Sequence, residues 1–298
     1  MKRRLFVTGY GGFVAGSIVK QASDDWEVIA ASRSPVPNGR PDVTHLQFDL
    51  RDFASLKQAF DDTRPTAVIH TAAMADIDRC QQNQRDAEAV NVHVTKCLVE
   101  LCRKHRARLV FCSTDTVFDG LRGRYTEADE PHPINFYGET KVEAEEHVQN
   151  GLANMVIARL ALVMGLPMIG AGNSFLARMI ASFQQNRSVL MPTNEIRTPI
   201  DVVTLGRALL ELASHDFTGL IHLAGSTRTN RYDLAIEIAN QLGYPSELVT
   251  PTNSAADLTR APRPADVSLN NATAASMLKT PLLNVADGLR LIMESQEK

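Results

Sequence analysis

Short apolar runs recur along the chain, and stretches with apolar residues at helical spacing separate them. These runs have the length and composition of buried strands. They cover residues 5–7, 28–31, 46–48, 67–70, 109–112, 155–158 and 220–223. The clearest helical stretch places Ala87, Val90, Val94, Leu98 and Leu101 three or four residues apart. This alternation predicts an α/β protein with a doubly wound parallel sheet of the Rossmann type.

The pattern loosens after residue 164, where glycine or proline stands at positions 165, 167, 170 and 172. We therefore expect a first domain over residues 1–164 and a smaller C-terminal lobe over residues 165–298. Segments around 197–224 are expected to return to the first domain. In the lobe, residues 232–242 predict a helix that Gly243 closes.

A glycine-rich turn, V-T-G-Y-G-G-F-V-A-G at residues 7–16, follows the first predicted strand. Gly9 permits a tight turn, and Gly12 lets the backbone approach a phosphate, with the N–H groups of the next helix pointing at the anion. Ala15 still allows close helix–strand packing. An ordinary surface turn is the alternative, but the position between a strand and an amphipathic stretch favours a dinucleotide site. The predicted contacts are Gly9, Gly11, Gly12, Phe13 and Val14.

The end of the second predicted strand indicates which dinucleotide binds. NAD enzymes usually place Asp or Glu there to bind the ribose 2′-hydroxyl, whereas this chain has Ser32 and Arg33. A guanidinium binds a 2′-phosphate that a carboxylate would repel. We therefore expect a preference for NADP(H) over NAD(H) and an NADP-binding first domain. The alternative is that Arg33 is a solvated loop residue.

Composition narrows the functional class. With 298 residues, 44% hydrophobic, the chain can bury a large core, and its net charge of −3 predicts neither nucleic-acid binding nor membrane association. Glycines 9, 11 and 12 interrupt the apolar core that a signal peptide needs. The histidines show no metal-ligand spacing, so no metal is expected. Cys80, Cys97, Cys102 and Cys112 form no C-x-x-C pair and predict buried, reduced thiols in a cytoplasmic protein.

Tyr137 and Lys141 share a face of a predicted helix because residues four apart are neighbours there. The ammonium is expected to lower the tyrosine pKa from about 10 and so activate an acid–base group. A surface helix pair is the alternative, since so short a motif is weak by itself. The polar residues 113–115 follow the predicted strand 109–112, at the carboxyl edge of the sheet, where doubly wound folds bind ligands.

Taken together, these and further segments resemble the extended short-chain dehydrogenases/reductases, most closely the branch that contains dTDP-4-dehydrorhamnose reductases. The matching segments are T-G-Y-G-G-F-V-A (8–15), F-D-L-R-D (48–52), H-T-A-A (70–73), Asn91, S-T-D-T-V-F-D-G (113–120), Y-G-E-T-K (137–141), Arg159 and R-T-P-I-D-V-V (197–203). They occur in the family order.

The resemblance implies roles for individual residues. It assigns catalysis to Thr114, Tyr137 and Lys141, and implies that Asn91 places Lys141 through a water molecule. A partly exposed asparagine is the alternative for Asn91. It also implies further cofactor contacts at Ser113 beside the nicotinamide, Asp49 and Leu50 beside the adenine, Ala72 and Ala73 beneath the cofactor, and Tyr137 and Lys141 themselves.

Two departures concern the substrate. The related rhamnose-forming enzymes carry a tryptophan where this chain has Leu162 and a tyrosine where it has Thr116. Asp115 also belongs to the expected substrate pocket. Arg263, in an R-A-P-R-P-A-D segment, either meets a diphosphate or braces a loop. The specific sugar is therefore left open.

The sequence predicts an NADP-dependent reductase of a keto group on a nucleotide-activated sugar or a related polar carbonyl substrate. A homodimer is compatible with this assignment. The alternatives are a sugar-nucleotide epimerase or dehydratase, a reductase of a non-nucleotide carbonyl compound, and a non-catalytic NADP-binding regulatory subunit. The last would resemble the β subunit of methionine adenosyltransferase. Thr116 argues against a dehydratase, because the resemblance places glutamate there in those enzymes.

Overall fold

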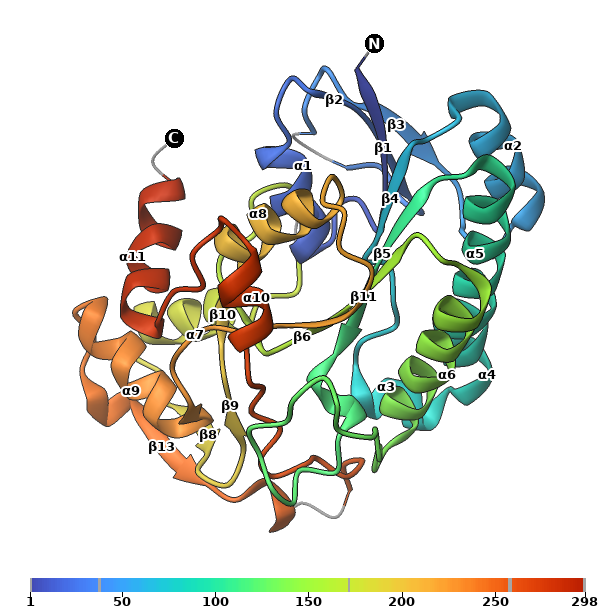
Figure 1. Cartoon of the computed structure of the whole chain (residues 1–298). Coiled ribbons are helices and arrows are strands. Elements are labelled where there is room, and N and C mark those ends of the chain that lie inside the picture. The colour runs from blue at the N-terminus through green and yellow to red at the C-terminus, as the bar shows by residue number, and fades with distance from the viewer. Residues whose placement is uncertain (1, 37–38, 171, 257–258, 297–298) are drawn as a thin grey trace.

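The computed structural model describes residues 2–36, 39–170, 172–256 and 259–296. Its centre is a seven-stranded parallel sheet in the order β11-β6-β5-β4-β1-β2-β3 (Figure 1). The strands are β1 (Arg3–Thr8), β2 (Trp26–Ser32), β3 (Thr44–Gln47), β4 (Ala67–His70), β5 (Arg108–Thr114), β6 (Met155–Leu160) and β11 (Gly219–Leu223). Each overlaps a predicted apolar run, so the prediction of a doubly wound α/β fold is confirmed.

The strand order reverses at β1, which pairs with β2 on one side and with β4 on the other. Ligands of open parallel sheets bind at such a switch point, outside the carboxyl ends of the strands. Here those ends are Thr8 and His70, which are register partners.

Helices cover both faces of the sheet (Figure 1). On one face α1 (Phe13–Gln21) packs against α8 (Val202–Leu212), and on the other lie α2 (Phe53–Thr63), α5 (Val94–His105) and α6 (Phe136–Gly151). The two-residue period of β1 serves both layers: Leu5 and Val7 belong to one core cluster, and Phe6 belongs to the other. The sheet is thus buried on both sides, as its nearly continuous apolar strands predict.

The C-terminal part of the chain builds a smaller unit with its own core, which includes Leu176, Phe183, Leu234 and Ile238 (lower left of Figure 1). The helices and small sheets of this part are α7 (Phe175–Gln184), α9 (Arg231–Gln241), α11 (Val285–Gln296), β7 (Val163–Met164), β8 (Val189–Pro192), β9 (Ile196–Arg197), β10 (Ile200–Asp201), β12 (Thr229–Asn230) and β13 (Val249–Thr252). α10 (Ala272–Met277) packs on β11 instead, and its Ala274 belongs to the core of the large sheet. Gly243, with φ +74°, follows α9 closely, as predicted. The domain boundary at residue 165 stays a prediction.

The helical stretch around residues 87–101 is not one regular α-helix. α3 (Ile77–Gln82) and α4 (Gln84–Glu88) are followed by a π-helical turn, η1 (Ala89–His93), which leads into α5. A π-turn widens the helix and often marks a functional site. It carries Asn91, whose side chain is fully inside, with 1% of its surface exposed. Apolar spacing alone could not show this irregularity.

Candidate active site

The glycine-rich turn between β1 and α1 is shaped for close approach. Gly9 has φ +79°, and a Cβ placed on it would lie 3.0 Å from Thr71 Oγ1. A Cβ on Gly12 would lie 2.8 Å from the backbone oxygen of Gly9. Gly12 caps α1 without a side chain, so the first N–H groups of the helix are directed outward. The turn therefore fits a dinucleotide pyrophosphate.

A cleft of about 760 Å³ opens at this turn. Its lining includes Gly9, Gly12, Phe13, Val14, Ser32, Arg33, Asp49, Leu50, Ala72 and Ala73, all of which the sequence predicts as cofactor contacts. Four predicted cofactor contacts are not in the lining: Gly11, Ser113, Tyr137 and Lys141. Gly11 lies against Val36 and Gly170 instead, and Ser113 is buried. The loops after the strands at the switch point thus meet around one cavity of ligand-binding size.

One end of the cleft is rich in charge. Arg33 is exposed there and makes no ion pair within the described chain. Ser32 is engaged inside the protein, with Oγ 2.6 Å from the Ser34 oxygen and 2.7 Å from His45 Nε2. The Asp49 carboxylate accepts hydrogen bonds from the side chain and the backbone N–H of Arg51, which hold the pKa of this carboxyl below the usual value. Arg51 also lines the cleft and was not predicted.

The predicted catalytic trio is buried beside this cleft. Thr114 ends β5, while Tyr137 and Lys141 lie in the first turns of α6; their exposed fractions are 8%, 9% and 2%. Met74 packs against the apolar cluster that Tyr137 forms with Cys80 and Ala87, and Met74 lines the cleft, although the trio itself does not. Lys141 Nζ donates to the backbone oxygen of Cys112 at 2.7 Å.

Burial shifts the pKa values of Tyr137 and Lys141. It raises the pKa of Tyr137 above its ordinary value, and the hydrogen bond with Thr114 offsets this only in part. The lowering that the sequence predicted from Lys141 is therefore wrong for this conformation, because loss of hydration outweighs the neighbouring charge. Burial also lowers the pKa of Lys141 to about 8. At neutral pH Tyr137 holds its proton and most Lys141 side chains are charged.

Asn91 holds the wall of the cleft in place. Its Oδ1 accepts from the Met74 backbone N–H at 2.8 Å, and its Nδ2 donates to the Met74 oxygen at 3.1 Å and to Thr140 Oγ1 at 3.0 Å. Asn91 is thus a fully bonded buried amide, and the alternative of a partly exposed residue is wrong. Its direct partners are Met74 and the neighbour of Lys141, rather than Lys141 itself. The water-mediated role stays a prediction.

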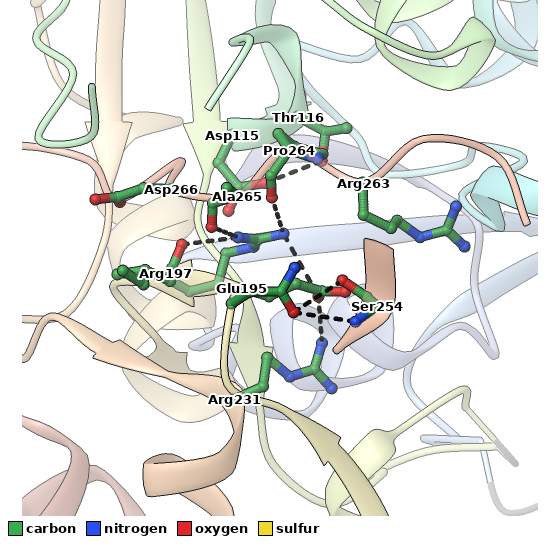
Figure 2. Close-up of polar contacts among 12 residues, drawn as sticks. Asp115, Thr116, Glu195, Arg197, Arg231, Ser254, Arg263, Pro264, Ala265 and Asp266 are labelled. Carbon is green, nitrogen blue, oxygen red and sulfur yellow. Dashed lines mark hydrogen bonds and ion pairs between the residues drawn. The ribbon is translucent and has the colours of Figure 1, made fainter. Parts of the chain in front are cut away.

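A largely buried charged cluster lies around Asp115, Glu195, Arg197 and Arg231 (Figure 2). Arg197 donates to the backbone oxygens of Ile196, Pro264 and Ala265 at 2.7, 3.1 and 3.2 Å. Glu195 Oε2 is 3.6 Å from Arg197 Nη2 and 4.0 Å from Arg231 Nη1. One carboxylate is therefore shared by two guanidinium groups, and Arg197 is committed to fixing the 264–265 segment.

Two buried polar atoms of this cluster have no hydrogen-bond partner within the described chain, Asp115 Oδ2 and Arg231 Nε. Asp115 Oδ1 is 3.3 Å from Thr114 Oγ1 and 3.2 Å from Thr116 Oγ1, and burial raises the pKa of this carboxyl. The Arg231 guanidinium lies 5.0 Å from the Phe175 ring centroid, and both residues line the cleft with Leu162. Buried polar atoms are normally paired, so this region is suited to a polar ligand.

Arg263 lies outside the cleft lining. Its Nη2 pairs with Asp78 Oδ2 at 2.8 Å, and its Nη1 donates to the Ala261 oxygen at 2.9 Å. Asp78 also accepts from the Ala261 N–H at 2.9 Å. The structure thus places Arg263 in the loop-bracing role that the sequence left open, and brings Arg231 to the cleft instead. Sequence gave no signal for Arg231, which stands outside every matching motif.

Among the residues that the structure describes, no group of histidine, cysteine, aspartate or glutamate side chains is arranged to hold a metal ion. The same residues include no helix that is both long and apolar enough to cross a membrane. The four cysteines are buried and unpaired by disulfides.

Known proteins resemble the chain over nearly its whole length. The family described as RmlD substrate binding domain matches residues 3–297. A dTDP-4-dehydrorhamnose reductase of Aggregatibacter actinomycetemcomitans is 27% identical over 286 residues, which cover 86% of this chain and 91% of that protein. The methionine adenosyltransferase 2 subunit beta of Xenopus laevis is 26% identical over 256 residues, which cover 84% and 75% of the two chains.

The fold has solved counterparts. The crystal structure of dTDP-4-dehydrorhamnose reductase from Bacillus anthracis, in complex with NADP, has a TM-score of 0.87 to this chain. The two sequences are 21% identical, and the alignment covers 99% of each chain. At this identity the likeness shows a shared fold.

Proposed function

The chain belongs to the RmlD substrate binding domain family, and from this membership we propose that it is an NADP-dependent reductase of a keto group on a nucleotide-activated sugar. The observation that carries the proposal is the cleft itself. It runs from the glycine-rich turn to Arg231, and Met74 in its wall packs against the apolar cluster that contains Tyr137. Side chains suited to the cofactor and to the substrate therefore line one cavity, and the proposed proton donor is buried behind its wall.

The residues at the glycine-rich end of the cleft support NADP as the cofactor. Gly9 and Gly12 leave space that a Cβ would fill, and the N-terminus of α1 accepts the pyrophosphate charge. The exposed Arg33 is free to bind a 2′-phosphate. When bound, the reduced nicotinamide supplies the hydride. The Bacillus anthracis reductase was solved with NADP, which agrees with this choice.

The chain's own residues handle the proton. Tyr137 is protonated because burial raises its pKa, so it suits donation to a carbonyl oxygen as the hydride arrives. Thr114 is hydrogen-bonded to Tyr137 and orients the same oxygen. Lys141 supplies a buried positive charge that stabilises the tyrosinate left behind.

Arg231 extends the proposal to the substrate. Arg197 and Arg263 are committed to backbone oxygens and to Asp78, which leaves Arg231 with a buried, unpaired Nε in the cleft. We propose that it binds an acidic group of the substrate, while Asp115 Oδ2 accepts from a sugar hydroxyl.

A second candidate is an NADP-binding regulatory subunit. The similarity to methionine adenosyltransferase 2 subunit beta, nearly equal in identity to that with the reductase, favours it. It predicts tight NADP(H) binding without turnover, and a protein partner.

The deciding experiment titrates the full chain with NADPH and then measures NADPH oxidation with a panel of keto-sugar nucleotides. Turnover that Arg231→Gln slows by raising KM, while Arg263→Gln changes KM little, supports the reductase with this substrate site. NADPH binding without any turnover across the panel, together with a co-purifying subunit, supports the regulatory candidate.

A further inference from the structure

A chain of buried hydrogen bonds lies under the cofactor cleft and is not used by the proposed chemistry. It begins at Thr8, the last residue of β1, and passes through His70, the last residue of β4. Thr8 Oγ1 is 2.7 Å from His70 Nδ1, and His70 Nε2 is 3.1 Å from Thr95 Oγ1. Thr95 Oγ1 then donates to the Asn91 backbone oxygen at 2.7 Å. All four residues are 1% exposed or less.

The donors and acceptors of this chain fix its direction. Thr8 Oγ1 already accepts from the backbone N–H groups of Thr71 and Ala72, at 3.1 and 3.2 Å. A hydroxyl has two acceptor sites and one proton, so the proton of Thr8 is left for His70 Nδ1. At the other end, the Thr95 hydroxyl proton is used on Asn91, so Thr95 accepts from His70 Nε2. The ring therefore carries one proton, on Nε2.

The two ends of the chain hold different parts of the site. Thr8 fixes the N–H groups of Thr71 and Ala72, which line the cleft beside the glycine-rich turn. Asn91 holds Met74 and Thr140 through its side chain. Met74 in turn packs against the apolar cluster of Cys80, Ala87 and Tyr137. His70 connects the two ends of this path, because one ring nitrogen bonds Thr8 beside the cofactor turn and the other bonds Thr95 beside the π-turn.

We infer that His70 is a positioning residue, which acts as the neutral Nε2–H tautomer and ties the cofactor turn to the π-turn that holds Met74 against the apolar cluster containing Tyr137. The inference rests on the proposed cofactor site. A neutral ring is also required by the surroundings, because the charge of Lys141 acts on His70 and its ring lies 5.7 Å from that of Phe111. Burial, with a smaller contribution from the charge of Lys141, lowers the pKa of His70 to about 3.

The tautomer is tested on the native protein by ¹⁵N NMR of labelled histidine, with His70 assigned by its loss in His70→Asn. We expect an unprotonated Nδ1 and a protonated Nε2, unchanged across the neutral pH range. A proton on Nδ1, or a ring that titrates near its ordinary pKa of about 6.5, would overturn the inference.

Two variants test the two hydrogen bonds of His70 separately. His70→Asn keeps an acceptor near Nδ1 for Thr8 and removes the hydrogen bond to Thr95. We expect NADPH affinity within about threefold of native, and faster hydrogen exchange at the Met74 N–H. His70→Gln places an amide near the position of Nε2 and removes the hydrogen bond to Thr8. We expect NADPH binding about tenfold weaker and Met74 exchange close to native.

His93→Gln is the matched control, because His93 is on the same π-turn but exposed. Adding Thr95→Val to His70→Asn should leave NADPH affinity unchanged, since the bond between His70 and Thr95 is already lost and the remaining Thr95 bond, to the Asn91 oxygen, does not reach the cofactor turn. Identical responses of the two His70 variants, or none in either, would refute the inference. If native protein does not bind NADPH, the proposed function fails, whereas the tautomer and the Met74 exchange still decide the role of His70.

Discussion

At the scale of single residues, the proposed chemistry depends most on Tyr137. The hydroxyl is buried, bonded to Thr114 and protonated at neutral pH. Replacing it with phenylalanine removes the proton donor and keeps the ring in its apolar cluster. We expect turnover to fall about 100-fold or more, with little change in NADPH affinity. Steady-state kinetics with the best keto-sugar substrate, beside a fluorescence titration of NADPH, checks this. An unchanged rate would remove Tyr137 as the acid.

Arg33 decides the choice of cofactor. It stands where an acidic ribose ligand would exclude a 2′-phosphate, and it is exposed in the cleft. We expect native protein to bind NADPH several times more tightly than NADH, and Arg33→Ala to lose most of that difference. Dissociation constants of both cofactors for both proteins measure this. Equal affinities in the native protein would contradict the assignment to NADP.

The lowered pKa of Lys141 leads us to predict that NADPH affinity depends on pH. Burial lowers its pKa to about 8, so the ammonium is charged below that pH and neutral above it. If the predicted contact between Lys141 and the cofactor forms, we expect NADPH affinity to fall about tenfold as pH rises through this value, because that contact loses its charge. Lys141→Met should show weak binding without this transition. A flat profile in the native protein would show that the charge of Lys141 does not contribute to binding.

At the scale of elements, α6 is tied to the sheet by a buried ion pair. Arg159 on β6 and Glu145 on α6 are 2.7 Å apart, with side chains 3% and 6% exposed. Neutralising one partner leaves the other charge buried, which typically costs 3–5 kcal/mol, so we expect Glu145→Gln to lower the free energy of unfolding by about 3 kcal/mol. Urea denaturation measures it.

The control for this prediction is Asp287→Asn. Asp287 pairs with Arg290 at 3.0 Å, and their side chains are 43% and 68% exposed, so solvent reaches both; Asp287 also accepts from Asn284 Nδ2 at 2.8 Å. Exposed pairs contribute about 0–1 kcal/mol, so this variant should be close to native. Equal effects of the two substitutions would mean that the pair between α6 and β6 is not what anchors the catalytic helix.

The π-turn shows how an element serves the site. A regular helix over the same residues would keep its apolar stripe but rotate Asn91 relative to Met74 and Thr140. The wider turn instead lets one buried amide bond both. The catalytic helix and the wall of the cleft are thereby joined at one residue.

At the scale of the whole molecule, substrate choice depends on the cleft between the sheet and the C-terminal unit. Leu162 lines it where the resemblance to rhamnose-forming enzymes implies an aromatic ring, and Thr116 replaces a second one. Each lost ring contact weakens sugar binding by about 1 kcal/mol. We therefore expect poor or no reduction of dTDP-4-keto-rhamnose.

The assay follows NADPH oxidation with enzymatically generated dTDP-4-keto sugar, beside an authentic dTDP-4-dehydrorhamnose reductase. Active-site integrity is checked in parallel by NADPH binding. Comparable catalytic efficiency of the two enzymes would show that the two substitutions are neutral, and would make this sugar the substrate.

The sequence by itself determined the strands, the glycine-rich turn and the position of the trio. Each depends on neighbours in the chain: apolar runs set the strands, Gly9 sets a left-handed turn, and a four-residue spacing places Tyr137 and Lys141 on one face. Such local patterns are readable because secondary structure repeats over a few residues.

Only the tertiary structure decided which charged groups are free and how the buried ones titrate. Arg263 is bound to Asp78, 185 positions away, while Arg231 is brought to the cleft by the packing of α9. The pKa of Tyr137 is raised, against the expectation from Lys141, because the fold removes water from the site. Ion pairing and hydration depend on residues that are distant in the chain, and no local pattern records them.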